Sequence, residues 1–496
     1  MADCTLVFPF QLFDPHPAIA RGRTIVFIED SLTFGDPHVG LKFHQQKIVL
    51  HRSAMKNYAA VLEQRGYDVA YREFQRGATV EDHLLALRDA GMDAFHFCQV
   101  VDYLLERRLA RSGERLGVRF HRYETPMFLT PDGMLEETFT SDKRPMMGRF
   151  YEKQRLRMGV LVDAGGAPAG GRWSYDDANR KPMPKKGLDV PGDPNTPVNA
   201  STVEAIAYTK KHFGDYYGDA KGFSYPVTHA DAELWFQRFL ENRFHLFGTY
   251  EDAISERERV LFHGVLSPML NIGLLAPQKL LDTTLAFAVA NEIPLNSVEG
   301  FVRQVIGWRE FVRGAYQHLG VTCRNGNFFG LEDRPIPAAF YEGRTGIDPV
   351  DTVIRRVIDY GWCHHIERLM ILGNFMLLCG FHPRRVYDWF MELFVDAYDW
   401  VMVPNIFGMS QFADGGLFTT KPYISGSNYV LKMSDFARGD WCGFWDGLFW
   451  TFVKTHEEYF RSQYRLAMMA KNLDRMGSEK LEIHRTQALA FLETLD

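Results

Sequence analysis

Cysteine is scarce in this sequence, and its placement excludes most cysteine-based sites. The 496 residues include six cysteines, and none of them forms a C-x-x-C pair. Their scatter does not match the disulfide framework of a small secreted domain. We therefore expect free thiols in a reducing compartment. The six are Cys4, Cys98, Cys323, Cys363, Cys379 and Cys442.

Long apolar runs and a leader segment are also missing. No stretch approaches the roughly 18 consecutive apolar residues of a membrane-spanning helix. The first residues, MADCTLVFPFQLFDPHP, lack the basic segment and long apolar core of a signal peptide. We therefore expect a cytoplasmic protein without a membrane partner.

The sequence has no excess of positive charge. Its formal net charge is −6, so no global basic field predicts nucleic-acid binding, although total charge says little about one face of a protein. No G-x-G-x-x-G motif follows the first predicted strand, so the usual dinucleotide fingerprint is absent. Aromatic residues are abundant, at 14%, which favours a site that stacks a planar ligand.

Residues 1–125 alternate β-rich runs with amphipathic segments. Strands are predicted for TLVFPF, RTIVFIED, GYDVAYREF and MDAFHFCQV, with GVRFHRYET as a weaker candidate. Helices are predicted for HQQKIVLHRSAMKNYAAVLEQRG and TVEDHLLALRDAG. Strands that alternate with helices of this length predict an α/β domain with a parallel, Rossmann-like sheet.

The composition changes after residue 125. The segment LVDAGGAPAGGRWSYDDANRKPMPKKGLDVPGDPNTP is rich in Gly, Pro, Asp and Lys, which predicts a connector wrapped on the surface rather than packed. From His229 onward, aromatic and aliphatic residues recur at three- and four-residue spacing, which predicts helices. We therefore expect an α/β domain over residues 1–135, a connector over 136–228 and a large all-helical domain over 229–496.

The segment YGWCHHIERLMILGNFMLLCGF, residues 360–381, is apolar on nearly every side after its two histidines, which predicts a buried helix. Taken alone, His364 and His365 are typical of hydrogen-bonded residues at a helix start. Metal binding with Cys363 and Cys379 is an alternative, but adjacent helical side chains diverge by about 100° and rarely share one ion. We therefore predict no metal site.

Six blocks, in this order along the chain, resemble the cryptochrome/photolyase family, and specifically its bacterial iron–sulfur (6-4) photolyase branch. They are FGTYEDAI, LFHGVLSPMLNIGLLAP, IPLNSVEGFVRQVIGWREFVRG, HHIERLMILGNFML, FVDAYDWVMVPNIFGMSQFADGG and KPYISGSNYVLKMSDF. FHQQKIVLHRSAMKNYA and GGRWSYDDANRKPMP are similar to that branch's antenna domain and connector. The resemblance implies an antenna-type first domain and a helical domain that binds FAD.

The resemblance also implies which residues contact FAD. The LSPMLN turn offers Ser267 and backbone N–H groups at a predicted helix start, where a pyrophosphate can bind. Met402 matches the position that in the wider family faces flavin N5, and its thioether cannot anchor a protonated N5 by a strong hydrogen bond. The full implied set is Tyr250, Ser267, Arg303, Trp308, Arg309, Asn374, Asp396, Met402 and Asn405.

In the branch that the chain resembles, a His-His pair lines the pocket above the flavin. Repair of a (6-4) product needs proton transfer as well as an electron, and histidine titrates near neutral pH. The resemblance therefore implies that His365 is the proton donor and His364 its structural or electrostatic partner. Tyr423 and Tyr429 match family positions that face the lesion.

The sequence departs from the branch at its iron–sulfur ligands. Ala437 and Asp440 occupy two cysteine positions, and GIDPVDTVI near Val350 contains no sulfur. Cys442 alone matches a ligand, whereas a [4Fe–4S] cluster needs four thiolates. We therefore predict that the chain binds no iron–sulfur cluster.

Two further departures concern light absorption and electron transfer. The branch holds a ribolumazine antenna with a Gly-Asp pair after its first strand, where this chain has Pro9 and Phe10, so an altered or empty antenna pocket is expected. An electron-transfer tryptophan of the branch aligns with Glu342. Trp389 is retained, and we expect photoreduction to use it with Trp362 or Trp400, or to be weak.

The sequence leaves four functions open. The first is an FAD-dependent, light-driven photolyase that reverses (6-4) products in UV-damaged DNA, acting as a monomer and contacting phosphates with a rim that includes Lys421, Lys432 and Arg438. The second is a cryptochrome-like photosensor that repairs nothing. The third is repair of cyclobutane dimers, and the fourth is a helical interaction protein without flavin.

Overall fold

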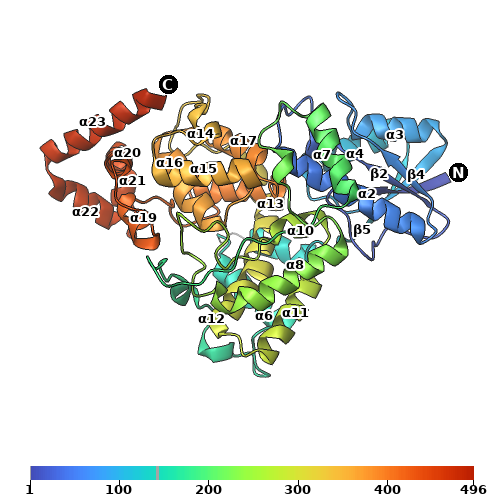
Figure 1. The fold of residues 1–496 in the computed structure, drawn as a ribbon, viewed down its shortest axis with the longest axis horizontal. Coiled ribbons are helices and arrows are strands. Elements are labelled where there is room, and N and C mark those ends of the chain that lie inside the picture. Colours follow the sequence, from blue (N-terminus) through green and yellow to red (C-terminus); the bar gives the residue numbers. More distant parts are fainter. Residues whose placement is uncertain (1, 141–143, 496) are drawn as a thin grey trace.

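Five parallel strands form the sheet at the N-terminal end of the protein. The computed structural model describes residues 2–140 and 144–495 (Figure 1). The strands are β1 (Ala2–Val7), β2 (Thr24–Ile28), β3 (Val69–Arg72), β4 (Met92–Cys98) and β5 (Arg119–Tyr123), in the order β3-β2-β1-β4-β5. The predicted strands, including the weaker fifth candidate, are confirmed.

Helices connect the strands and bury the sheet. They are α1 (Ser31–Phe34), α2 (Gln45–Gln64), α3 (Val80–Asp89) and α4 (Tyr103–Leu116). The central strands β1 and β4 are almost wholly buried, because helices cover both faces of a parallel sheet. The chain leaves β1 toward β2 and returns to β4 on the other side. This reversal places a crevice at the carboxyl ends of β1 and β4, where open α/β sheets bind ligands.

The connector is more ordered than its composition suggests. It contains α5 (Asp132–Phe139), α6 (Met147–Met158) and α7 (Ala200–His212), and the predicted first boundary at residue 135 falls inside α5. The rings of Phe139 and Phe150 pack 5.0 and 5.6 Å from that of Phe311. These helices lie outside residues 161–197, the segment from which a surface connector is predicted, and aromatic contacts bury α5 and α6.

The Gly- and Pro-rich part of the connector follows the prediction more closely. Between α6 and α7 it forms two short 3-10 turns, η1 (Ala169–Gly171) and η2 (Asp176–Asn179), and η3 (Ala220–Gly222) follows α7. Helix α7 packs beside α2 (Figure 1), where Arg52 bonds to Glu204 and lies over the ring of Tyr208 at 3.6 Å. The connector thus ties the sheet domain to the rest of the chain.

Helices make up the rest of the chain, as predicted. The first are α8 (His229–Asn242), α9 (Phe244–Phe247), α10 (Ser267–Ile272), α11 (Pro277–Ala290), α12 (Leu295–Val302), η4 (Arg303–Trp308), α13 (Arg309–Arg324), α14 (Ala339–Glu342) and α15 (Asp348–Tyr360). Then come η5 (Glu367–Gly373), α16 (Asn374–Leu378), α17 (Pro383–Leu393), α18 (Asp399–Val403), η6 (Pro404–Ser410), α19 (Ser427–Met433), α20 (Trp441–Thr455), α21 (Glu457–Ser462), α22 (Ala467–Met476) and α23 (Ser478–Leu495).

Figure 1 shows α20 to α23 at the opposite end of the molecule from the sheet. The segment after the two histidines forms η5 and α16, which are buried almost throughout, as its apolar pattern predicted. No helix among the described residues is both long enough and apolar enough to span a bilayer.

Three of these segments, η4, η5 and η6, are π-helical. A π-helical turn holds more residues than an α-helical turn, and such turns are frequent at functional sites. The three segments lie within or beside the blocks from which the FAD contacts are predicted. Sequence periodicity did not predict these segments. It shows which face of a helix is apolar, but it does not show that a turn contains one extra residue.

Candidate functional site

Arg309 begins α13 directly after η4, and two of its three guanidinium nitrogens lack a partner among the described residues. Its Nη1 donates to Asn271 Oδ1 at 2.7 Å, whereas the buried Nε and Nη2 atoms have no hydrogen-bond partner within residues 2–140 and 144–495. Burial lowers the pKa of Arg309 to about 10. The group lies 4.9 Å from the Trp400 ring and 5.1 Å from the Phe128 ring. A desolvated cation with two free donors needs an anionic or polar ligand.

Asp396 gathers the residues around Arg309. Arg368 donates from Nη1 to Oδ1 at 3.0 Å and from Nη2 to Oδ2 at 2.9 Å, a bidentate pair. Ser267 donates to Asp396 Oδ2 at 2.5 Å, and Asn271 donates to the Asp396 carbonyl at 3.0 Å. Asn271 therefore links Arg309 to Asp396. The fold brings Ser267, Arg309 and Asp396 together from three distant parts of the chain.

The predicted contact Asn374 is bonded to its own chain. Its Nδ2 donates to Ser425 Oγ at 3.0 Å, and Ser425 N donates to its Oδ1 at 3.2 Å. Asn374 thereby holds the loop that carries Tyr423. Met402, in α18, is buried, and the side chain of Asn405 donates to the Val401 carbonyl at 2.7 Å.

Two other predicted contacts lie on aromatic surfaces. Tyr250 is buried and stacks on Phe262, with ring centroids 5.5 Å apart. Trp308, half-buried at the end of η4, packs 6.2 Å from the ring of Phe311. The ring of each side chain can stack on a planar ligand or pack in the protein core.

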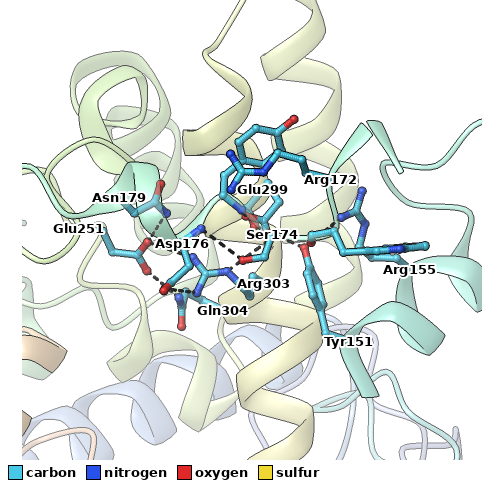
Figure 2. Close-up of polar contacts among 12 residues, drawn as sticks. Tyr151, Arg155, Arg172, Ser174, Asp176, Asn179, Glu251, Glu299, Arg303 and Gln304 are labelled. Atoms are coloured by element: carbon cyan, nitrogen blue, oxygen red, sulfur yellow. Dashed lines mark hydrogen bonds and ion pairs between the residues drawn. The ribbon is translucent and has the colours of Figure 1, made fainter. Parts of the chain in front are cut away.

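Arg303 is enclosed by carboxylates (Figure 2). It lies 3.2 Å from Asp176, 3.3 Å from Glu299 and 3.6 Å from Glu251. Glu251 also accepts from Asn179 at 2.7 Å and, through its other oxygen, from Gln304 at 2.6 Å. The network fastens the connector turn η2 to α12 and η4. Sequence reasoning missed Glu251, because a carboxylate in a polar loop gives no sign of the cation that it will meet.

Replacing Arg303 with methionine is expected to lower the free energy of unfolding by about 3 kcal/mol. The change leaves Glu299 and Glu251 buried without their cation, and that unpaired burial is the larger part of the cost. Urea denaturation followed by circular dichroism measures the effect. The matched control is Arg180→Met, since Arg180 pairs with Asp176 on the exposed surface and should cost less than about 1 kcal/mol. Equal losses in the two variants would refute the structural role of Arg303.

His364 is buried beside another histidine. Its ring stacks on that of His263 at 4.6 Å and 11°, and its Nε2 lies 3.5 Å from Glu367 Oε2. Burial and neighbouring cationic groups hold the pKa of His364 well below its usual value, so the ring is neutral at pH 7. Burial raises the pKa of Glu367 to about 7, and Arg356 contacts it at 2.8 Å. Sequence reasoning missed His263, because it is about 100 residues from His364 in the chain and the two rings meet only in the folded protein.

His365 differs from His364 in its exposure to solvent. Its side chain is exposed, unlike that of His364, yet the surrounding protein and Arg368 lower its pKa to about 4. The exposure indicates that a ligand can reach His365, whereas His364 is buried.

Tyr423 and Tyr429 are half-buried on the side of the connector network. Burial raises the pKa of both phenols, and Asp252 and Arg180 act on both through their charges. Burial and the nearby Glu251 raise the pKa of Asp252 to about 7. The two tyrosines therefore lie next to the polar cluster around Arg303.

The three predicted electron-transfer tryptophans are buried. Trp389 donates to the Phe340 carbonyl at 3.1 Å. The ring of Phe394 lies 6.0 Å from that of Trp389 and 4.4 Å from the Arg368 guanidinium. Trp362 lies 6.0 Å from the same guanidinium, and Trp400 lies beside Arg309. Trp362 thus lies beside the Arg368–Asp396 pair, and Trp389 is connected to it through Phe394. Trp400 is connected to it through Arg309 and Asn271.

Two indole rings pack near Ala437, one of the positions predicted to lack a cluster cysteine. Trp441 and Trp445 are buried with centroids 5.9 Å apart, and the Trp441 Nε1 donates to the Ala437 carbonyl at 3.2 Å. In the part of the chain that the structure describes, no group of three or more His, Cys, Asp or Glu side chains is arranged to hold a metal ion. The absence of an iron–sulfur cluster stays a prediction, and Cys442 is buried in α20.

Comparison with known proteins gives two family matches. The family described as deoxyribodipyrimidine photo-lyase-related protein matches residues 5–225, and the FAD binding domain of DNA photolyase matches residues 301–437. The chain is 33% identical over 467 residues to a (6-4) photolyase of Agrobacterium fabrum, which covers 91% of this chain and 92% of that protein. The predicted resemblance is confirmed.

Solved structures agree on the fold. A cryptochrome of Synechocystis superposes with a TM-score of 0.59 at 15% identity, over 83% of each chain. A bacterial class III photolyase of Agrobacterium tumefaciens gives a TM-score of 0.57 at 17% identity, over 100% of this chain and 98% of that one. The predicted α/β domain followed by a helical FAD-binding region is therefore confirmed. With a relative 33% identical over nearly its whole length and two family matches, the chain belongs to the cryptochrome/photolyase family.

Proposed function

We propose that the chain is a light-driven photolyase that reverses (6-4) pyrimidine products. The observation that carries this proposal is the placement of His365. Its imidazole is exposed, follows the buried His364 in the chain and feels the charge of Arg368, which pairs with Asp396. A proton donor for a bound lesion needs this access.

The residues present fit FAD. The two unpaired donors of Arg309 suit a phosphate or flavin oxygen, and Ser267 and Asn271 lie within the same hydrogen-bonded group. We assign Arg309, Ser267, Asn271, Arg368 and Asp396 to FAD binding. When bound there, FAD supplies the light-absorbing centre and the electron for the lesion.

The two histidines have different roles in proton transfer. His365 hands a proton to the lesion, because solvent and substrate can reach it. His364 stays neutral and fixes the orientation of its neighbour through the stack on His263 and the contact with Glu367. Tyr423 and Tyr429 bound the space for the flipped-out bases, whose impaired stacking makes their extrusion inexpensive in free energy.

A cryptochrome-like photosensor is the second candidate, and Glu342 favours it. This residue is exposed at the end of α14 and pairs with Arg344, so a carboxylate stands where the branch has an electron-transfer tryptophan. Irradiation of the purified protein with separate (6-4) and cyclobutane oligonucleotides distinguishes the candidates. Reversal of the (6-4) substrate supports the first proposal, and turnover of neither substrate supports the photosensor. Turnover of the cyclobutane substrate alone would show that the protein repairs cyclobutane dimers instead of (6-4) products.

Damaged DNA is the proposed partner, and its binding should depend on salt. Lys421, Lys432 and Arg438 are exposed and near the proposed lesion site in sequence. Replacing all three with alanine should reduce the slope of log K against log[salt] by about 0.9 for each phosphate that the variant no longer neutralises. Fluorescence anisotropy with a lesion-containing duplex over a salt series measures the slope. Arg111→Ala, on the exposed side of α4, is the control, and an unchanged slope in the triple variant would show that this rim does not bind DNA.

A further inference from the structure

A small crevice lies between the sheet and the helical domain. It sits at the carboxyl ends of β1, β2 and β4, where the strand order reverses, and residues before and within α18 cover it. Open α/β sheets bind their ligands at this place. The chain's resemblance to photolyases implies a ribolumazine antenna there, held by a Gly-Asp pair that this chain replaces with Pro9 and Phe10.

The crevice is too small for such a molecule. Its cavity measures about 30 Å³. A single water needs at least about 10–15 Å³, so one or two waters fit. Sites for drug-sized ligands measure roughly 300–1,000 Å³. Gln11 Oε1 and Trp400 Nε1 belong to residues that line the cavity, and neither atom has a hydrogen-bond partner among the described residues.

Phe10 fills the crevice from the sheet side. Its side chain is 8% exposed, and its ring stacks on that of Phe8 with centroids 6.2 Å apart. It meets the ring of Tyr398, from the helical domain, edge-on at 6.5 Å. A glycine or aspartate at this position would leave the volume of the phenyl ring free. The substitution therefore converts chromophore space into a contact between the domains.

Lys47 fills the crevice from helix α2. This α2 residue is 1% exposed, and its Nζ donates to the Ala397 carbonyl at 2.5 Å. The ammonium lies 4.4 Å from the Phe43 ring and 5.0 Å from the Tyr398 ring, so two aromatic faces stabilise the charge. The hydroxyl oxygen of Tyr398 in turn lies 3.2 Å from His51 Nε2. The side chain of Lys47 thus joins the sheet domain to the loop that follows Asp396.

We infer that this crevice has become an interdomain contact and does not admit a bicyclic antenna chromophore. Phe10 and Lys47 enter it from the sheet domain, and Tyr398 and Trp400 close it from the helical domain. Flavin is then the chromophore that absorbs light in this protein. The inference does not depend on which lesion is repaired, because none of the residues proposed to face the lesion lines this cavity.

The test is binding of 6,7-dimethyl-8-ribityllumazine to the flavin-loaded full-length protein. Wild-type protein produced together with lumazine synthase should elute from gel filtration with flavin and without lumazine, as judged by the absorption of the extracted chromophores. Stoichiometric retention of lumazine by the wild type would overturn the inference, whatever the outcome of the repair assay.

Two variants test the interdomain contact. Phe10→Ala should lower the melting temperature by about 5 °C, because it removes a buried ring between the domains. Phe10→Leu keeps most of the volume and should melt near the wild-type temperature, again without binding lumazine. If Phe10→Ala melts like the wild type, Phe10 does not join the domains and the inference fails.

Discussion

Replacing His365 with alanine is expected to slow light-driven reversal of (6-4) products at least about 100-fold. The flavin content and the affinity for damaged DNA should stay near the wild-type values. A positioned general acid contributes about 10²–10⁴ to a rate, and a methyl group cannot supply a proton. Single-turnover repair under blue light, with flavin content read from absorbance, measures the effect.

The pH dependence adds a readout that a purely structural role would not change. The surrounding protein and Arg368 lower the pKa of His365 to about 4, so the fraction of protonated imidazole increases as the pH falls. The wild-type repair rate should therefore rise as the pH falls from about 8 to about 6, and the rate of the alanine variant should not. An equal pH dependence in both proteins would remove His365 as the donor.

The matched control is His245→Ala. His245 is an exposed histidine in α9, and the bond that it makes to Ser297 uses its backbone carbonyl. Its replacement should leave repair, flavin content and stability unchanged. If the two histidine variants lost repair to the same extent, the loss would reflect general damage to the protein.

Replacing Arg309 with methionine is expected to yield protein with little or no flavin. Two charge-assisted hydrogen bonds would be lost, worth about 3 kcal/mol together at the lower bound, so affinity should fall at least about 100-fold. The flavin-to-protein ratio after purification gives a first measurement. Titration of apoprotein with FAD, followed by flavin fluorescence, gives the change in Kd.

The stability of the apoprotein separates a binding role from a structural one. Without a ligand, the Arg309 guanidinium is desolvated and two of its donors lack partners, which costs free energy. The methionine variant should therefore be as stable as wild-type apoprotein or more so, and should gain less stability when FAD is added. A less stable apoprotein that still binds FAD normally would show that Arg309 serves the fold.

Much of the fold was predictable from local pattern. The first four strands and helices α2 and α3 follow from periodicity and flanking glycines, and the buried helix after His365 follows from its uninterrupted apolar run. The connector helices α5 and α6 were not predictable, because their neighbours along the chain are polar and their buried faces depend on Phe311, more than 150 residues away.

The candidate site divides in the same way. Ser267, Arg309 and Asp396 were named from blocks that resemble a known family, and the fold places them in one hydrogen-bonded group. Arg303 was named from the same block as Arg309, yet three carboxylates surround it. Both arginines look alike in sequence. Each has two buried guanidinium nitrogens without a hydrogen bond, but among the described residues only Arg303 of the two has carboxylates within ion-pair distance. Which charges an arginine meets is decided by the folded chain.

The sequence by itself determined the architecture and the family, since these depend on residue types and their order. The tertiary structure decided which histidine is open to a ligand, that His263 stacks on His364, and that Phe10 and Lys47 fill the crevice beside the sheet. The physical reason is that access, desolvation and volume arise when segments distant in sequence pack against each other, and no local pattern records which segments will meet.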